Sequence, residues 1–154
     1  MNALRGLLVW LALAGGAAAA DVEVTEPWAR ATPGAASNGA IYLSVSNHGA
    51  DMAIIAASSP AAKAASLHGH EMDGDMMRMR ALERVSLGAG ETVTFAPGGL
   101  HIMLMGLAAP LVEGESLSLT LTFAGSESAT IDVPILGVAA MGPGGGHSGH
   151  GGHH

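Results

Sequence analysis

Hydrophobic and polar positions alternate with a period of two in short stretches through the middle of the chain. The stretches richest in Val, Ile, Leu and Thr are 40–47, 52–59, 92–97, 100–107, 116–124 and 129–136. Turn sequences containing Gly, Pro, Asn and Asp separate them, and no window keeps a helical stripe over three turns. Seven or eight strands at this spacing, without helices to connect parallel strands, predict an all-β antiparallel sandwich or barrel.

The same alternation separates the two faces of individual strands. In residues 116–123, SLSLTLTF, the leucines and Phe123 fall on one face, which is typical of a half-buried strand near the middle of a sheet. In residues 101–105, HIMLM, the two branched aliphatics share a face that suits a core. The histidine and both methionines share the other face, which is either a soft surface patch or half of a metal site.

Both ends of the chain differ in composition from this middle part. Residues 1–20 hold Arg5 ahead of an apolar run that ends in small residues, which indicates a secretory signal cleaved after Ala20. The apolar run is shorter than the ~20 residues that a spanning helix needs, so no transmembrane span is expected after cleavage. Residues 141–154 are rich in Gly and His and are expected to be a disordered tail. One β domain is therefore predicted over residues 21–140 of an exported protein.

Composition and charge exclude several kinds of function. The chain has no cysteine, so it can form neither a disulfide framework nor a thiolate metal ligand. A blue-copper electron-transfer centre, which needs a Cys ligand, is excluded for the same reason. The formal net charge is −7, which argues against nucleic-acid binding because phosphate neutralisation needs clustered Lys and Arg.

Side chains with nitrogen and sulfur donors are concentrated in two segments, 67–80 and 101–105. The first, LHGHEMDGDMMRMR, holds two histidines and four methionines. A lone methionine usually fills a gap in a core, but here several lie among Asp, Gly and Arg. If residues 76–82 form a strand, Met77 and Met79 share one face and the two arginines share the other. Two such strands brought together would make a site with sulfur and nitrogen ligands.

The softness of these donors indicates which metal they favour. Thioethers and imidazoles without carboxylate or thiolate ligands select Cu(I), because soft sulfur pairs with a soft ion. A catalytic zinc site is not expected, since such sites combine His with Glu, Asp or Cys. Histidine must be deprotonated to bind, so the affinity for metal is expected to weaken as the pH falls through the imidazole pKa near ~6.5.

The spacing of four of these residues resembles the His-x10-Met-x21-His-x-Met pattern of periplasmic copper chaperones of the PCu(A)C type. The matching residues are His68, Met79, His101 and Met103. Two longer blocks are also similar to this family: PWARATPGAASNGAIYLSVSN at 27–47 and PGGLHIMLMGLAAPLVEGESLSLTLTF at 97–123. The resemblance covers nearly all of residues 21–136.

The resemblance implies a cupredoxin-like Greek-key β-sandwich that holds one Cu(I) through those four residues near the surface. It implies delivery of copper in the periplasm to the Cu(A) centre of cytochrome c oxidase, often beside a Sco-type thiol protein. Holding and releasing copper needs no acid–base pair or nucleophile, so we expect a monomer that is not an enzyme. The nearby residues outside the pattern are taken as auxiliary: His70, Met72, Met77 and Met105.

The His-rich tail resembles C-terminal extensions of some family members and is a candidate for a separate Cu(II) site. Its histidines are His147, His150, His153 and His154. Nitrogen donors on a flexible backbone suit Cu(II), which prefers a tetragonal arrangement. The alternative for the tail is a solubilising terminus without a metal.

Two other functions remain compatible with the sequence. A copper storage or resistance protein would buffer periplasmic copper without delivering it, and its deletion would reduce copper tolerance but not oxidase activity. An adhesion or interaction sandwich would use the methionine-rich face to bind protein, and a copper titration would separate it from both copper functions.

Overall fold

The computed structural model describes residues 21–125 and 127–143, in which all regular structure is β-strand. Ten strands follow one another: β1 (Val22–Arg30), β2 (Asn38–Asn47), β3 (Met52–Ser58), β4 (Ala62–Asp73), β5 (Met76–Leu82), β6 (Val85–Leu87), β7 (Thr92–Phe95), β8 (His101–Leu107), β9 (Ser116–Phe123) and β10 (Ser128–Leu136). The described residues include no helix that is long and apolar enough to cross a membrane. The predicted signal and the four tail histidines lie outside the described residues.

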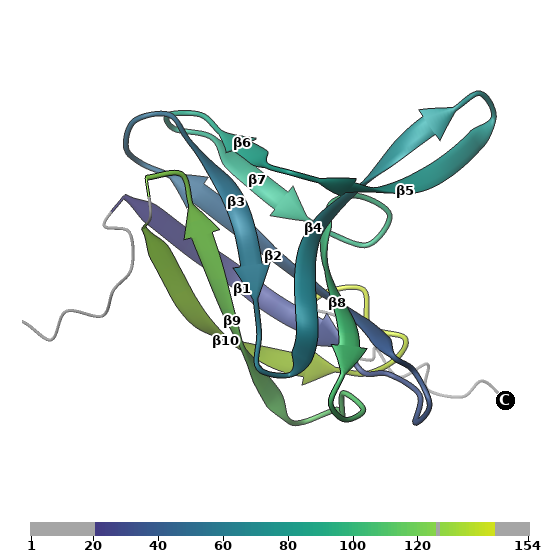
Figure 1. Cartoon of the computed structure of the whole chain (residues 1–154). Helices are drawn as coiled ribbons and strands as arrows, with labels where there is room; N and C mark the ends of the chain where they lie inside the picture. Colours follow the sequence, from purple (N-terminus) through teal and green to yellow (C-terminus); the bar gives the residue numbers. More distant parts are fainter. Residues whose placement is uncertain (1–20, 126, 144–154) are drawn as a thin grey trace, which may run out of the picture.

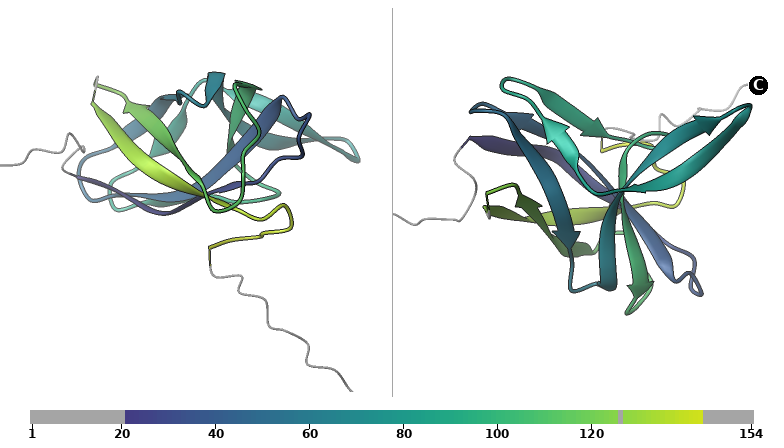
Figure 2. Two further views of the ribbon diagram at one scale, coloured as in Figure 1. Left: turned by 90° about the horizontal axis from the view of Figure 1, so that it is seen from below. Right: turned by 45° about the horizontal axis from the view of Figure 1, so that its top comes forward.

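The strands form one sheet that closes on itself. Its order is β5-β4-β8-β2-β1-β10-β9-β3-β6, β7 pairs with β2, and a further pairing joins β3 to β4. Figure 2 shows the strands curving around a common interior, with both layers strongly twisted. The predicted all-β sandwich is confirmed, with ten strands in place of the seven or eight expected.

One strand pairing departs from the antiparallel arrangement expected from the sequence. β1 and β10 run parallel, with Ala29 opposite Ile135. β1 also contains a bulge, because its register against β2 shifts between Thr25 and Trp28 and Glu26 has a positive φ of 52°. A bulge adds an unpaired residue and bends the strand. The alternation in β1 is broken there, which is why the pattern did not predict this strand.

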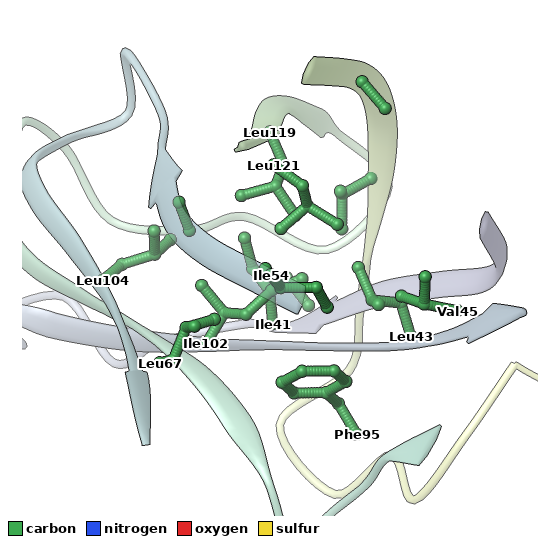
Figure 3. Packing of buried hydrophobic residues seen from close by; sticks show 14 of the residues in the cluster. Ile41, Leu43, Val45, Ile54, Leu67, Phe95, Ile102, Leu104, Leu119 and Leu121 are labelled. Atoms are coloured by element: carbon green, nitrogen blue, oxygen red, sulfur yellow. The ribbon is translucent and has the colours of Figure 1, made fainter. Parts of the chain in front are cut away.

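Inward-facing aliphatic side chains from both layers meet in one core, which Figure 3 shows. The alternation predicted for β9 is confirmed, since its three leucines and Phe123 are buried and the residues between them are not. In β8, Ile102 and Leu104 are fully buried in the same core. Burying one such side chain contributes about 1.5–3 kcal/mol, so these alternating positions fix which face of β8 points inward.

The far half of β4 and most of β5 stand apart from this core, against which Leu82 at the end of β5 packs. They form a hairpin that projects from the sandwich (Figure 1), and β5 contributes no fully buried side chain. A two-residue turn at Gly74 and Asp75 connects the strands, with Gly74 at a φ of 62°. The hairpin therefore presents its side chains to solvent at the place where the sequence concentrates methionines.

Candidate metal centre

The outward face of β8 carries the donors that the HIMLM alternation predicted. With Ile102 and Leu104 in the core, His101 and Met103 lie on the opposite face of the strand. β8 pairs with β4 on one side and β2 on the other, and this register places His101 directly opposite His68. Residues directly opposite each other share a sheet face, so two of the predicted ligands are cross-strand neighbours.

The two histidine rings are held in defined orientations. Their centroids are 5.5 Å apart and the rings are nearly parallel, at 24°. The His101 Nδ1 donates to the carbonyl oxygen of Gly99 at 3.1 Å. The His68 Nδ1 lies 3.1 Å from the hydroxyl of Ser66 and 3.5 Å from its carbonyl oxygen. A carbonyl can only accept, so in neutral His101 the Nδ1 carries the proton and Nε2 keeps a free lone pair, as in histidines that bind metals.

Burial changes the acidity of one of these rings. His101 is 6% exposed, and the pKa of its imidazole is lowered mainly because the charged form loses hydration. The hydrogen bond to Gly99 raises this pKa in part, and the nearby rings of His68 and His70 lower it further when they are charged. His101 is therefore held in the neutral form that a metal ion requires.

The hairpin brings two more donors to the same face. Met79 of β5 lies opposite His70 of β4 and is 55% exposed. The ring of His70 is 5.6 Å from that of His101, edge to face at 78°. His70 has no place in the four-residue sequence pattern, yet it lies at the centre of the cluster. The sequence signal for this position is the spacing of the two histidines. Residues two apart in a strand point to the same face, so His70 shares a face with His68.

A depression of about 330 Å³ lies where β2, β4, β5 and β8 meet on this face. The donors that line it are His70, Met79, His101 and Met103. Small residues make room for it, since Gly39 and Ala40 of β2 lie beside Met103. Three of the four predicted ligands therefore line one hollow. The fourth, His68, lies against the His101 ring that forms part of its wall.

An aromatic pair with an arginine forms the β1–β2 side of the depression. The rings of Trp28 and Tyr42 are 4.6 Å apart, and the Arg30 guanidinium lies 5.8 Å and 5.9 Å from their centroids. Arg30 also donates to the carbonyl of Ala140 at 2.8 Å and 3.2 Å. These contacts give the depression a well-packed wall with one cation at its rim.

No Asp or Glu side chain of the described residues lines the depression. Within residues 21–125 and 127–143, no three His, Cys, Asp or Glu side chains come together in a way that could hold a metal ion. Met105, an auxiliary candidate, lies two residues beyond Met103 and opposite Asn38. The methionine sulfurs that lie beside the imidazoles in this depression favour a soft ion.

Comparisons with known proteins agree with this fold. The family model "Putative lipoprotein LpqE-like" matches residues 22–135. A protein described as "Putative lipoprotein Lxx21020", from Leifsonia xyli subsp. xyli (strain CTCB07), is 36% identical over 123 residues, which is 78% of this chain and 72% of that protein. The description of both as lipoproteins fits an exported protein.

Solved structures that share this fold include PCuAC domains and DR1885 from Deinococcus radiodurans. The copper-bound PCuAC domain from PmoF2 has a TM-score of 0.66 at 22% identity, covering 76% of this chain and 93% of that one. The apo PCuAC domain from PmoF1 has a TM-score of 0.63 at 26% identity, covering 75% and 92%. The solution structure of CuI-DR1885 from Deinococcus radiodurans has a TM-score of 0.58 at 26% identity, covering 79% and 83%.

The resemblance inferred from residue spacing is thus confirmed by the fold. The cupredoxin-like sandwich, expected from that resemblance, is the architecture that this chain shares with the PCuAC domains. Since the family model spans most of the described residues and the Leifsonia relative exceeds one third identity, the protein belongs to the LpqE-like family.

Proposed function

We propose that this protein is a periplasmic copper carrier that binds one Cu(I) and passes it to the Cu(A) centre of cytochrome c oxidase. Its ligands in this proposal are His68, Met79, His101 and Met103. The observation that carries the proposal is the convergence of two thioethers and at least two imidazoles on one solvent-facing sheet face, beside a hollow without carboxylates. The copper-bound PCuAC domain from PmoF2 and the Cu(I) form of DR1885, which share this fold, support the choice of metal.

The proposed site can both hold a Cu(I) ion and release it to an acceptor. His101 is neutral and anchored by Gly99, so it offers Nε2 without paying for deprotonation near neutral pH. Met79 sits on the projecting hairpin and is more than half exposed, so its sulfur can detach while the other donors stay in place. An ion held in this way is accessible to an acceptor, which a closed thiolate cage would prevent.

Delivery to cytochrome c oxidase rests on the resemblance to PCu(A)C chaperones, and a Sco-type thiol protein is the second partner in the proposal. Transfer from thioether and imidazole donors to a thiol-containing acceptor runs downhill, because a thiolate is the stronger ligand for a soft ion. The chain takes part as a donor and needs no catalytic residue for this step.

Copper binding is tested by anaerobic titration of the protein with Cu(I), followed by X-ray absorption on the loaded form. One Cu(I) per folded domain with mixed sulfur and nitrogen ligation is expected. Replacing His68 or His70 by Gln, one at a time, decides which of these two imidazoles binds the ion. The proposed ligand set requires that the affinity for Cu(I) falls more in His68→Gln than in His70→Gln. Absence of Cu(I) binding, or ligation by oxygen alone, overturns the proposal.

Delivery is tested by deleting the gene and measuring two phenotypes at low and high copper. Loss of oxidase activity at low copper, restored by the intact protein and not by a His101→Gln variant, supports delivery. Loss of copper tolerance with normal oxidase activity shows instead that the protein stores or buffers copper.

A further inference from the structure

Three methionines of the β4–β5 hairpin lie beyond the depression and have no part in the four-ligand site. Met72, Met76 and Met77 are 61%, 63% and 62% exposed. A methionine usually contributes by filling space in a core, and these three are too exposed to do so. They stand on the part of the molecule that projects furthest from the sandwich (Figure 1).

The register of the hairpin pairs two of these methionines. Met72 lies directly opposite Met77, and the next pair on the same face is His70 with Met79. Directly opposite side chains have Cβ atoms about 4.5–5.5 Å apart, and two residues along a strand span about 7 Å. The thioether pair Met72–Met77 is therefore one step further out than the donors that line the depression.

Four charged residues of the two hairpin strands lie on its other face and are paired with one another. Arg78 contacts Asp73 at 3.2 Å, and Arg80 contacts Glu71. These ion pairs connect β4 to β5 and engage both carboxylates, which line a shallow depression beside Met72 and Met79. The carboxylates nearest to Met72 and Met77 are therefore paired with arginines, and the thioether face of the hairpin offers sulfur and imidazole donors, which favour a soft monovalent ion.

We propose that Met72 and Met77 form a second, outer Cu(I) site, and that the ion passes between this site and the depression through His70 and Met79. This inference rests on the proposed function, because the outer site would connect the four-ligand site at the depression to the tip of the hairpin. Each step exchanges one thioether or imidazole ligand for another. Copper stays Cu(I) throughout, and no proton or electron is transferred.

The test uses the full chain with ¹³C-methyl methionine, titrated with Ag(I) as a redox-stable soft ion and then with Cu(I) under anaerobic conditions. Each methionine methyl gives its own NMR signal, so metal bound elsewhere in the chain does not obscure the result. The test variant is Met72→Leu with Met77→Leu, which keeps the size of both side chains. Met76→Leu is the matched control, since Met76 is as exposed as Met77 but lies on the other face.

The Met103 signal is expected to shift with the first equivalent of metal and the Met72 and Met77 signals with the second. The double variant should bind the second equivalent on the order of tenfold more weakly and release Cu(I) to a chelator more slowly, with the first equivalent unchanged. The control should behave as the wild type. Stationary Met72 and Met77 signals while Met103 shifts, or equal effects in the control, overturn the outer site. A stationary Met103 signal overturns the proposed function as well.

Discussion

The imidazole ring of His101 is both hydrogen-bonded to the backbone and buried. The Gly99 carbonyl fixes the proton on Nδ1, and loss of hydration lowers the pKa, so the ring is oriented and neutral before any metal arrives. The His-x-Met spacing identified His101 as a candidate ligand, but it could not show that the ring is oriented and neutral in the metal-free protein. Burial of a ring on the outer face of a sheet depends on the neighbouring strands, which the local sequence does not specify.

The lowered pKa of His101 predicts how the stability of the metal-free protein depends on pH. Below the ordinary imidazole value of about 6.5, the unfolded chain takes up a proton that folded His101 resists, so the free energy of unfolding falls until the folded pKa is passed. One group cannot contribute more than about 1.4 kcal/mol per pH unit. Urea unfolding between pH 7.5 and 5 should show a shallower dependence in His101→Gln than in the wild type.

His48 supplies the control for this measurement. It is exposed and lies on the loop after β2 beside Glu23. His48→Gln removes an exposed imidazole in place of a buried one, and so measures what the loss of a surface histidine does to the same unfolding curves. A dependence that is unchanged in His101→Gln would contradict the assignment to His101.

Met77 and Met79 differ by one step along the same face of β5, which allows the ligand assignment to be tested by substitution. Met79 lines the depression together with His101, whereas Met77 lies opposite Met72 further out. Met79→Leu should weaken binding of the first Cu(I) about tenfold or more, and Met77→Leu much less, in a competition titration with a chelator. Equal losses, or a larger loss at Met77, would show that the pattern has been aligned two residues out of register.

At the scale of elements, the sequence predicted strands where hydrophobic alternation is regular. β2, β3, β7, β8, β9 and β10 lie within a few residues of their expected ranges. β4 was not recognised as a whole strand, because its first half is rich in Ala and its second half is polar. It is a strand because β3, β5 and β8 all pair with it. Pairing with three other strands, of which β8 is distant in sequence, decided its structure and with it the position of His70 in the cluster.

A substitution in the hairpin turn tests whether the β4–β5 hairpin can open locally without destabilising the core of the sandwich. Gly74 has a φ of 62°, and a side chain there meets no other atom, so Gly74→Ala costs only backbone strain, about 1 kcal/mol. The cost should fall on the hairpin, because β5 adds no fully buried side chain to the core. Hydrogen exchange of β4–β5 amides should accelerate, and Cu(I) affinity should decrease, with little change in the thermal unfolding midpoint.

Gly34→Ala is the matched control for this substitution. Gly34 also has open space around it, but it is not among the glycines with positive φ. Faster exchange spread evenly over the core strands in Gly74→Ala would contradict a locally adjustable hairpin.

At the scale of the whole molecule, the predicted tail and the folded domain should behave as two separable metal sites. The tail histidines suit Cu(II), while the sulfur-containing face suits Cu(I). Truncation after Met141 keeps the hydrogen bonds of Arg30 to Ala140, so the wall of the depression is preserved. The truncated protein should lose the Cu(II) signal in electron paramagnetic resonance and keep its Cu(I) stoichiometry. A full Cu(II) signal without the tail, or loss of Cu(I) binding, would contradict the two-site interpretation.

The packing of Trp28 against Tyr42 gives the protein a built-in optical reporter. Of the two tryptophans in the sequence, the other lies at position 10, so a chain that starts at Asp21 has a single indole. Ile41 of β2 pairs with Ile102 of β8, so the same register brings Tyr42 next to His101. On the other side of β2, Tyr42 pairs with Trp28 of β1. Filling the depression should therefore alter the emission of Trp28. Its fluorescence can then be followed in real time, without a label, as copper arrives and as it leaves for an acceptor.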